Sequence, residues 1–299
     1  MRKKAKVLVF GGSGFLGSYF CKLNKKFFNI ISPPHSEIDV LNYDQINEYI
    51  KKSDAPVVIN FVALADVDKS EKEKGNRNGT AYKLNTKAAR HLSKICKKTG
   101  KHLIQISTDC VFSGGKSARP YNEDDKPNPL NWYGTTKYLG ESLVKKSGCS
   151  YCIARVEMAY TADLGFKNKD DFVRFFLTQL SAGHKIKAIE NQKITPTYIN
   201  DVATALKWLI ENRAKGIFHI ASTDSISPFE FAVKLAEEFG LDPKLVQPIK
   251  FGSLRDRSPR PKNPWLDVTK FQTKYGSGIL HSNRESIKLL KKHFKPSYD

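Results

Sequence analysis

The feature that most constrains the fold is a glycine-punctuated turn near the N-terminus. Residues 6–10 form a short apolar run, after which Gly11, Gly14 and Gly17 stand at three-residue intervals. The first glycine lets the chain turn, the second lets backbone N–H groups approach a pyrophosphate, and the third lets a helix pack closely on a strand. Because a strand precedes these glycines and a helix is predicted over 15–26, we predict a dinucleotide-binding unit.

Apolar runs and helical patterns alternate through the first half of the chain. This alternation is typical of a parallel, doubly wound sheet with helices on both faces. Strands are predicted at 6–10, 29–32, 56–61, 102–107 and 151–156, with helices between them that include a long one over 80–99.

The second half of the chain mixes fewer strands with helices. Helices are predicted near 170–182, over 201–212, after 227–228 and over 283–293, strands near 187–190 and 216–221, and a Pro- and Arg-rich irregular stretch over 248–264. The fold class is therefore α/β, a Rossmann doubly wound parallel sheet with a smaller C-terminal substrate-binding lobe. We expect residues 1–165 and 195–225 to form the Rossmann domain, and 166–194 and 226–299 the lobe.

The net charge of +20 raises the possibility of a nucleic-acid partner. The lysines recur near the ends of most predicted helices, as at Lys25, Lys97 and Lys291, where cations suit the helix dipole. This distribution favours a solvated surface over a nucleic-acid patch. No apolar stretch approaches the roughly 20 residues that cross a bilayer, so we expect no membrane partner.

Five cysteines are present, an odd number in a chain too large to need disulfide staples. Cys149 and Cys152 have the spacing of a redox or zinc pair, but they enter an apolar strand and lack a second Cys or His pair. We interpret them as core cysteines, expect no metal site, and place the protein in the cytoplasm.

Chemistry is expected beyond the carboxyl ends of the strands, where ligands of open parallel sheets lie. Small residues over 60–65 would let a flat ring lie against the backbone, and Ser107, Thr108 and Asp109 present hydroxyls and a carboxylate together. Tyr133 and Lys137 are four residues apart at the start of a helix, so they share one face.

The spacing of Tyr133 and Lys137 suits proton transfer. A lysine ammonium beside a phenol is expected to lower the phenol pKa from about 10 toward the working pH, which favours proton transfer at a carbonyl or alcohol. Thr108 could hold the substrate oxygen. This is the one Tyr-x-x-x-Lys in the chain, and it follows both the hydroxyl cluster and the glycine turn.

With these motifs the sequence resembles the extended short-chain dehydrogenase/reductase family and, within it, the dTDP-4-dehydrorhamnose reductases. The resemblance covers nearly the whole chain. It rests on the Gly11–Gly17 turn, 37–40, 60–71, 107–112, Tyr121 and Glu123 with Pro127 and Pro129, 133–137 with Gly140 and Glu141, Gln192, 196–197, 201–203, 216–219, Arg260 with Pro261, and Leu266 with Asp267.

The resemblance implies an NAD(P)H-dependent reductase of a nucleotide-linked 4-keto-6-deoxysugar that acts in deoxysugar or polysaccharide biosynthesis, with a homodimer as a possible assembly. Thr108 would orient the keto oxygen, Tyr133 would donate the proton, and Lys137 would hold the nicotinamide ribose. The cofactor side would comprise Gly11, Gly14, Phe15, Leu16, Gly17, Asp39, Val40, Ala63, Leu64, Ala65, Tyr133 and Lys137, and the substrate side Thr108, Asp109, Cys110, Met158 and Arg260.

The cofactor is expected to be NADPH, with NADH possible. The second predicted strand ends at Ser32 and is followed by Pro33, Pro34 and His35. An acidic residue that would bind a ribose 2′-hydroxyl and repel a 2′-phosphate is therefore absent there.

Two departures from the family pattern leave alternatives open. Cys110 stands where the family commonly has Tyr, and Met158 stands where it has Trp. GDP-fucose synthases, which epimerise before reducing, have a catalytic cysteine at the Cys110 position, so a 3,5-epimerase/4-reductase is one alternative. A non-catalytic subunit that resembles the β subunit of methionine adenosyltransferase is another. A 4,6-dehydratase is disfavoured because Asp109 is followed by Cys110 instead of Glu.

Overall fold

The computed structural model describes residues 4–116, 118–161, 171–253 and 258–294. Its centre is a six-stranded sheet in the order β2-β1-β3-β4-β5-β9, in which every neighbouring pair is parallel. The strands are β1 (Lys6–Phe10), β2 (Asn29–Ile31), β3 (Val57–Asn60), β4 (His102–Thr108), β5 (Ser150–Val156) and β9 (Gly216–Ile220). Strand order reverses between β1 and β3, which is where parallel α/β sheets place their ligands.

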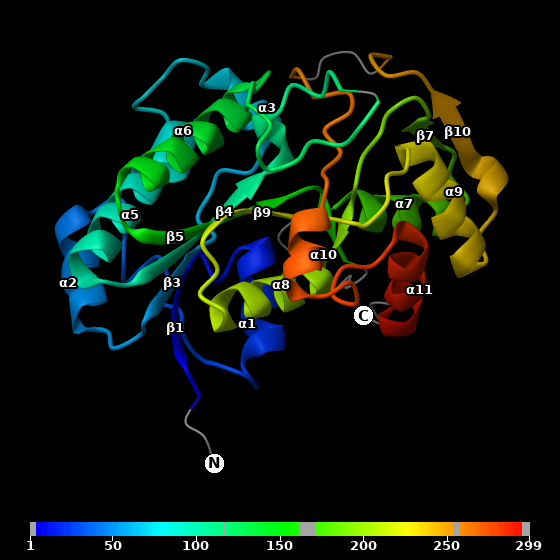
Figure 1. Cartoon of the computed structure of the whole chain (residues 1–299). Coiled ribbons are helices and arrows are strands. Elements are labelled where there is room, and N and C mark those ends of the chain that lie inside the picture. Colours follow the sequence, from blue (N-terminus) through cyan, green and yellow to red (C-terminus); the bar gives the residue numbers. More distant parts are fainter. Residues whose placement is uncertain (1–3, 117, 162–170, 254–257, 295–299) are drawn as a thin grey trace.

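Helices cover both faces of this sheet (Figure 1). On one face α1 (Phe15–Asn24) packs beside α8 (Ile199–Glu211). On the other lie α2 (Tyr43–Lys52), α5 (Ala88–Thr99) and α6 (Trp132–Lys146). The alternation of side chains along β1 feeds both layers, since Val7 and Val9 join the core under α1 and α8 whereas Leu8 and Phe10 join the core under α2 and α5.

The long helix predicted over 80–99 is helical throughout but changes its winding. It comprises α4 (Thr80–Tyr82), a π-helical segment η1 (Lys83–Lys87), and α5. Short π segments widen a helix by one residue and occur frequently at functional sites. Hydrophobic periodicity predicted the helix but does not report such a local change of pitch.

A second layer of elements forms a lobe at the C-terminal side of the sheet, on the right in Figure 1. A separate hydrophobic core, which includes Tyr160, Phe231 and Leu290, holds it together. Its elements are β6 (Ala159–Tyr160) paired with β8 (Thr197–Tyr198), β7 (Ile186–Ile189) paired with β10 (Val246–Ile249), α7 (Phe172–Ser181), α9 (Pro228–Phe239), η3 (Pro243–Leu245) and α11 (Asn283–His293).

The expected fold class is confirmed, and most predicted elements lie within two residues of their observed bounds. Several short elements of the second half were not predicted: β6, β8, η3, β10 and α10 (Thr269–Tyr275). β10 ends inside the stretch expected to be irregular, with Pro248 on a two-stranded edge where it costs no hydrogen bond of a central strand. α10 lies before the terminal helix and packs on β9. Residue 170, near which a helix was predicted to start, lies outside the described residues, and α7 begins at Phe172.

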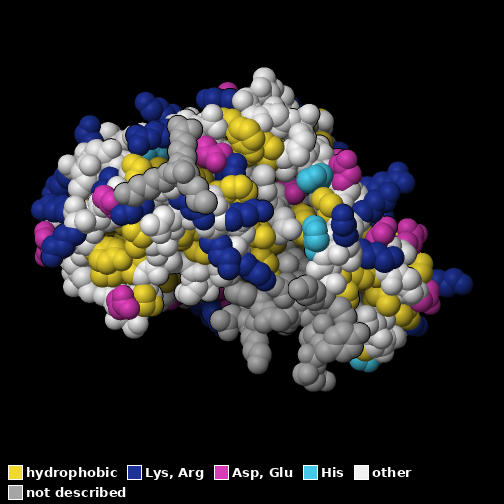
Figure 2. All heavy atoms as spheres, turned by 90° about the horizontal axis from the view of Figure 1, so that it is seen from below, with side chains coloured by type: hydrophobic (Ala, Val, Ile, Leu, Met, Phe, Trp, Pro, Cys, Tyr) yellow, Lys and Arg dark blue, Asp and Glu magenta, His cyan; other side chains and the backbone are white. Residues whose placement is uncertain are grey.

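Basic side chains are scattered over the one face of the molecule that the space-filling view in Figure 2 shows. On this face Lys and Arg side chains lie among polar and hydrophobic ones (Figure 2). Within the described ranges, no helix is both long enough and apolar enough to cross a bilayer.

Two buried histidines give the fold a specific sensitivity to acid. His102 is 1% and His219 0% exposed, and burial lowers the pKa of His102 to about 4 and that of His219 to about 3. Both are neutral in the folded chain at pH 5, whereas in the unfolded chain they bind a proton below about pH 6.5. Their stabilising contribution is present above pH 6.5 and is lost as pH falls toward their folded pKa values.

We therefore expect His102 to lower the free energy of unfolding by about 2 kcal/mol between pH 7.5 and pH 5, against the opposite effect of buried carboxyls such as Asp171, whose raised pKa favours the folded state in acid. Urea denaturation at both pH values measures it. The glutamine of His102→Gln does not titrate. Between pH 7.5 and pH 5 the free energy of unfolding of this variant should therefore fall by about 2 kcal/mol less than that of the wild type. Equal losses in the two proteins would contradict the assignment to His102.

Candidate active site

The glycine turn brings three backbone segments closer than side chains would allow. Gly11 has a φ of 78°, and a Cβ there would lie 2.8 Å from the backbone nitrogen of Val62, just beyond β3. A Cβ on Gly17 would lie 2.2 Å from the carbonyl oxygen of Gly11. Gly14 precedes α1 and is exposed, so the first N–H groups of that helix face outward at the strand-order reversal. An anion would find its donors there.

The other predicted cofactor positions follow β2 and β3. The Asp39 carboxylate accepts a hydrogen bond from Leu41 N at 2.9 Å, and His91 Nδ1 lies 3.3 Å from the carbonyl oxygen of Val40. Ala63 and Leu64 are half-buried and Ala65 is exposed. Phe15 and Leu16, the first residues of α1, are also half-buried. All these residues border the carboxyl edge of the sheet.

Asn85 is a site residue that the sequence analysis missed. It is 2% exposed, and its Oδ1 accepts from Leu64 N at 2.9 Å while its Nδ2 donates to Thr136 Oγ1 at 3.0 Å. Asn85 lies in the π-helical segment η1, and a Cβ on Gly140 would lie 2.4 Å from its carbonyl oxygen. Asn85 thus joins the loop after β3 to α6. The local widening of the helix at η1 is the one feature that distinguishes this position, and it is not visible in the sequence.

Thr108 and Tyr133 meet where β4 ends and α6 begins. Thr108 Oγ1 donates to Asp109 Oδ1 at 2.8 Å. The Thr108 side chain also forms a hydrogen bond with the Tyr133 phenol, which lowers the pKa of that phenol. The approach is possible because residue 134 is a glycine. A Cβ at this position would lie only 2.1 Å from the Cys110 carbonyl oxygen. Asn131 caps α6 by accepting from Gly134 N at 2.8 Å.

Lys137 lies one turn along α6 from Tyr133, as predicted, and its Nζ donates to the Ile106 carbonyl oxygen at 2.7 Å. Burial lowers the Lys137 pKa to about 8, with the Glu141 charge acting in the opposite direction. The lysine therefore remains mainly protonated at neutral pH.

The prediction that Lys137 lowers the Tyr133 pKa is wrong for this structure. Burial, followed by the electrostatic influence of Cys110 and Asp109, raises the pKa of the phenol, and the hydrogen bond with Thr108 offsets only part of the shift. A phenol that keeps its proton at neutral pH is suited to donate it to a developing alkoxide.

Two carboxyl groups and a thiol share the floor of the site. Burial raises the Asp109 pKa to about 6, and burial together with the Asp109 charge raises the pKa values of Glu157 and Cys110. The Cys110 thiol lies 3.7 Å from Asp109 Oδ2, to which it donates. Glu157, also missed from the sequence, accepts from the Thr195 hydroxyl. At neutral pH the thiol is protonated.

A cavity of about 610 Å³ opens in front of these groups. Four predicted substrate residues line it together: Asp109, Cys110, Met158 and Arg260. Thr108 lies behind it, 5% exposed. The opposite wall comes from the lobe and includes Phe172, Phe175, Phe176, Ile189, Gln192 and Pro261.

Met158 shapes the cavity by an uncommon backbone conformation. Its φ is 38°, in the left-handed region that favours glycine, and its side chain is 40% exposed. The chain turns here from β5 into β6, so the strain accompanies the point where the sheet gives way to the lobe.

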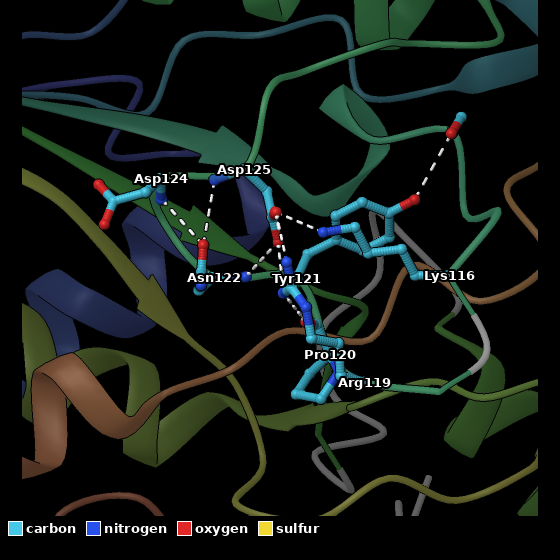
Figure 3. Close-up of polar contacts among 8 residues, drawn as sticks. Lys116, Arg119, Pro120, Tyr121, Asn122, Asp124 and Asp125 are labelled. Atoms are coloured by element: carbon cyan, nitrogen blue, oxygen red, sulfur yellow. Dashed lines mark hydrogen bonds and ion pairs between the residues drawn. The ribbon is translucent and has the colours of Figure 1, made fainter.

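An ion-paired loop around Asp125 pairs with residues 265–267, a few positions beyond Arg260. Figure 3 shows Lys116 and Arg119 converging on Asp125, with both Arg119 contacts at 2.9 Å. These cations and the Asn122 amide hold the Asp125 pKa below its usual range, although burial opposes the shift. Tyr121, inside this loop, exchanges backbone hydrogen bonds with Trp265 and Asp267.

The described residues contain no candidate metal site. Across the described ranges, no three His, Cys, Asp or Glu side chains are grouped so as to hold a metal ion. Cys149 and Cys152 are both buried, and all five cysteines are free thiols.

The fold and the site together define a Rossmann-type α/β protein in which a threonine, a tyrosine and a lysine gather where β4 ends and α6 begins. More narrowly, the chain belongs to the family described as RmlD substrate binding domain, whose model matches residues 5–295. The predicted resemblance to dTDP-4-dehydrorhamnose reductases is thereby confirmed.

Three relatives illustrate the range of the family. A dTDP-4-dehydrorhamnose reductase of Mycolicibacterium smegmatis is 31% identical over 94% of this chain and 84% of its own. A dTDP-4-dehydrorhamnose reductase of Bacillus anthracis, solved in complex with NADP, superposes with a TM-score of 0.87 at 27% identity, covering 97% and 99% of the two chains. Methionine adenosyltransferase 2 subunit beta of Mus musculus is 29% identical, covering 95% of this chain and 86% of its own.

Proposed function

We propose that this protein is an NADPH-dependent reductase of a nucleotide-linked 4-keto-6-deoxysugar, of the dTDP-4-dehydrorhamnose reductase type, in deoxysugar or polysaccharide biosynthesis. The observation that carries the proposal is the grouping of Thr108, Tyr133 and Lys137 where β4 ends and α6 begins, next in the chain to the cavity residues Asp109 and Cys110. Relatives named as dTDP-4-dehydrorhamnose reductases, one of them bound to NADP, support it.

The site residues fit a dinucleotide. The close contacts of Gly11 and Gly17 hold the start of α1 at the sheet edge, and the exposed Gly14 leaves room for a pyrophosphate. Phe15 and Leu16 would meet the same group, Asp39 and Val40 the adenine, and Ala63 to Ala65 the nicotinamide half. When bound, the reduced nicotinamide supplies the hydride.

The chain's own residues then complete the reduction. Thr108 holds the keto oxygen, and Tyr133 donates its proton to that oxygen as negative charge develops on it. Lys137 holds the nicotinamide ribose through the hydrogen-bond donors of its ammonium group. Arg260 binds the diphosphate that links sugar and nucleoside, and Asp109, Cys110 and Met158 shape the sugar pocket.

We further propose the domain division predicted above, with 1–165 and 195–225 holding the cofactor and 166–194 and 226–299 covering the substrate. The separate hydrophobic core of the lobe supports this division, although Leu266, Phe271 and Leu280, on the lobe side of the division, pack into the core of the sheet domain. Five free thiols are in keeping with a cytoplasmic protein. We propose a nucleotide-sugar as partner, a homodimer as assembly, and neither nucleic acid nor membrane.

Replacing Tyr133 by Phe should remove the proton donor and leave the ring in place. We expect at least about a hundredfold loss in kcat with cofactor affinity nearly unchanged, the size of effect that general acid catalysis supplies. Nicotinamide absorbance with a panel of nucleotide-4-keto sugars measures turnover, and fluorescence titration measures cofactor binding. Tyr138→Phe, on the same helix, is the matched control. Near-normal reduction by Tyr133→Phe would refute the assignment of Tyr133 as the proton donor.

A regulatory subunit is the second candidate function, because methionine adenosyltransferase β subunits are among the relatives. The same panel separates the two candidates. A wild-type protein that binds cofactor saturably but reduces none of the sugars would favour the regulatory function over the reductase.

Cofactor preference should depend on Ser32, which follows β2. Its hydroxyl lies 2.1 Å from where a Cβ of Gly12 would stand, so this side chain overlies the glycine turn. We expect the wild type to prefer NADPH, and Ser32→Asp to lower the ratio of NADPH to NADH efficiencies at least about tenfold by repelling the 2′-phosphate. Steady-state kinetics with both cofactors decides, and an unchanged ratio would place the 2′-phosphate elsewhere.

The epimerase alternative rests on Cys110, which lines the cavity. If the thiol exchanges protons beside the ketone, the wild type in deuterated water without reduced cofactor should introduce deuterium at C3 or C5 of the sugar. Cys110→Ser should lose much of this exchange and still reduce an already epimerised substrate. The raised pKa of the thiol leads us to expect no exchange by the wild type, the result of a simple reductase. Mass spectrometry of the recovered sugar gives the answer.

A further inference from the structure

The motif at 66–71 has no role in the reaction as described so far. It forms a short helix, α3 (Val67–Lys72), capped by Asp66, whose side chain accepts from Lys69 N. Asp68 and Glu71 are three residues apart and therefore share one face of this helix. Its first residue, Val67, lines the cavity.

Asp68 holds the segment that carries Arg260. Its Oδ2 accepts from Arg260 Nη2 at 2.8 Å, and its Oδ1 accepts from the Ser258 amide at 2.9 Å. The Arg260 Nη1 donates to the Ser258 carbonyl oxygen at 3.1 Å. One carboxylate therefore fixes both the backbone and the guanidinium of this segment, and the remaining guanidinium hydrogens are left for a ligand in the cavity.

Glu71 holds the start of α6. Its Oε2 accepts from the Trp132 amide at 2.6 Å, and its Oε1 pairs with Lys74 at 2.9 Å. Trp132 directly precedes Tyr133, and its amide is one of the orphan donors at the helix N-terminus, where a negative charge is favourable.

Asn131 closes the arrangement. While its Oδ1 caps α6, its Nδ2 donates to the Pro259 carbonyl oxygen at 2.9 Å. The segment 258–260, helix α3 and the first turn of α6 are thus tied pairwise by hydrogen bonds, in a triangle at the cavity edge.

We propose that Asp68 and Glu71 are positioning residues of the reaction: Asp68 orients Arg260 toward the substrate's diphosphate, and Glu71 fixes the turn of α6 that carries Tyr133. The inference rests on the proposed function, since it names what orients two of its residues. On this proposal, helix α3 supports both Arg260, which binds the substrate, and Tyr133, which donates the proton.

The sign of the effect of Asp68→Asn separates orientation from simple charge. The substitution removes one negative charge beside Arg260, so long-range electrostatics alone predicts tighter binding of an anion. Loss of orientation predicts weaker binding. We expect the dissociation constant of dTDP, measured by calorimetry, and the KM of the sugar nucleotide each to rise about tenfold, the value of one charge-assisted hydrogen bond, with kcat within about twofold.

A double-mutant cycle tests whether Asp68 acts through Arg260. On an Arg260→Gln background, Asp68→Asn should have little further effect on dTDP affinity. Full additivity of the two substitutions, or tighter binding by Asp68→Asn alone, would overturn the role of Asp68. Glu48→Gln removes an exposed carboxylate from a comparable i,i+3 pair with Lys51 on α2, and it should change neither constant.

Glu71 should affect the other kinetic constant. We expect Glu71→Ala to lower kcat about tenfold with KM within about threefold, and Glu71→Gln, which keeps an acceptor for the Trp132 amide, to recover most of the loss. Thermal unfolding of each variant checks that the fold is retained. An unchanged kcat in Glu71→Ala would overturn its role.

The proposed function can fail separately from this inference. A wild type that reduces no sugar of the panel fails as a reductase, while the dTDP titrations still decide the role of Asp68. If the wild type itself binds no dTDP, the orientation of Arg260 toward a diphosphate is refuted. A working reductase whose Asp68 and Glu71 variants behave as the wild type refutes the inference alone.

Discussion

The buried ion pair between Arg155 and Glu141 is the interaction on which the geometry of the site depends. Two parallel contacts, at 2.9 and 2.7 Å, join β5 to α6, and both side chains are at most 1% exposed. The Arg155 guanidinium also lies 5.0 Å from the Phe112 ring centroid, beyond the end of β4. Removing one partner of such a pair typically costs about 3–5 kcal/mol, because the other charge remains buried and unpaired.

The pair fixes the helix that supplies both chemical groups. Glu141 lies one turn beyond Lys137, and Lys137 one turn beyond Tyr133, so a single helix face runs from the anchored carboxylate to the phenol. At the other end, Glu71 and Asn131 hold the first turn. Between these two attachments Gly134 and Gly140 let α6 come within contact of Cys110 and Asn85. The helix is therefore attached at two places, and its two glycines allow it to pack closely against the neighbouring backbone.

These relations explain which parts of the structure could be predicted from the sequence. The period of the apolar residues predicted the strands and helices, and the glycine intervals predicted the turn at Gly11, because both depend on local geometry. The grouping of Thr108 with Tyr133 followed from the rule that strand ends share one edge. Asn85, Glu157 and the ties of Asp68 depend on contacts between distant segments or on a local change of helix pitch. No spacing within the sequence encodes those.

The Tyr133 pKa shows why local spacing is an incomplete guide to chemistry. An i,i+4 lysine would lower the pKa of an exposed phenol, but here the Lys137 ammonium donates to the Ile106 carbonyl oxygen, and burial and the charge of Asp109 act on the phenol in the opposite direction. Desolvation favours the neutral form of every acid on this floor, including Cys110 and Glu157. A site built this way holds its protons until a developing alkoxide provides a stronger base than water, so it favours proton donation over abstraction. That bias matches reduction of a ketone, and it opposes the thiolate that epimerisation through Cys110 would need.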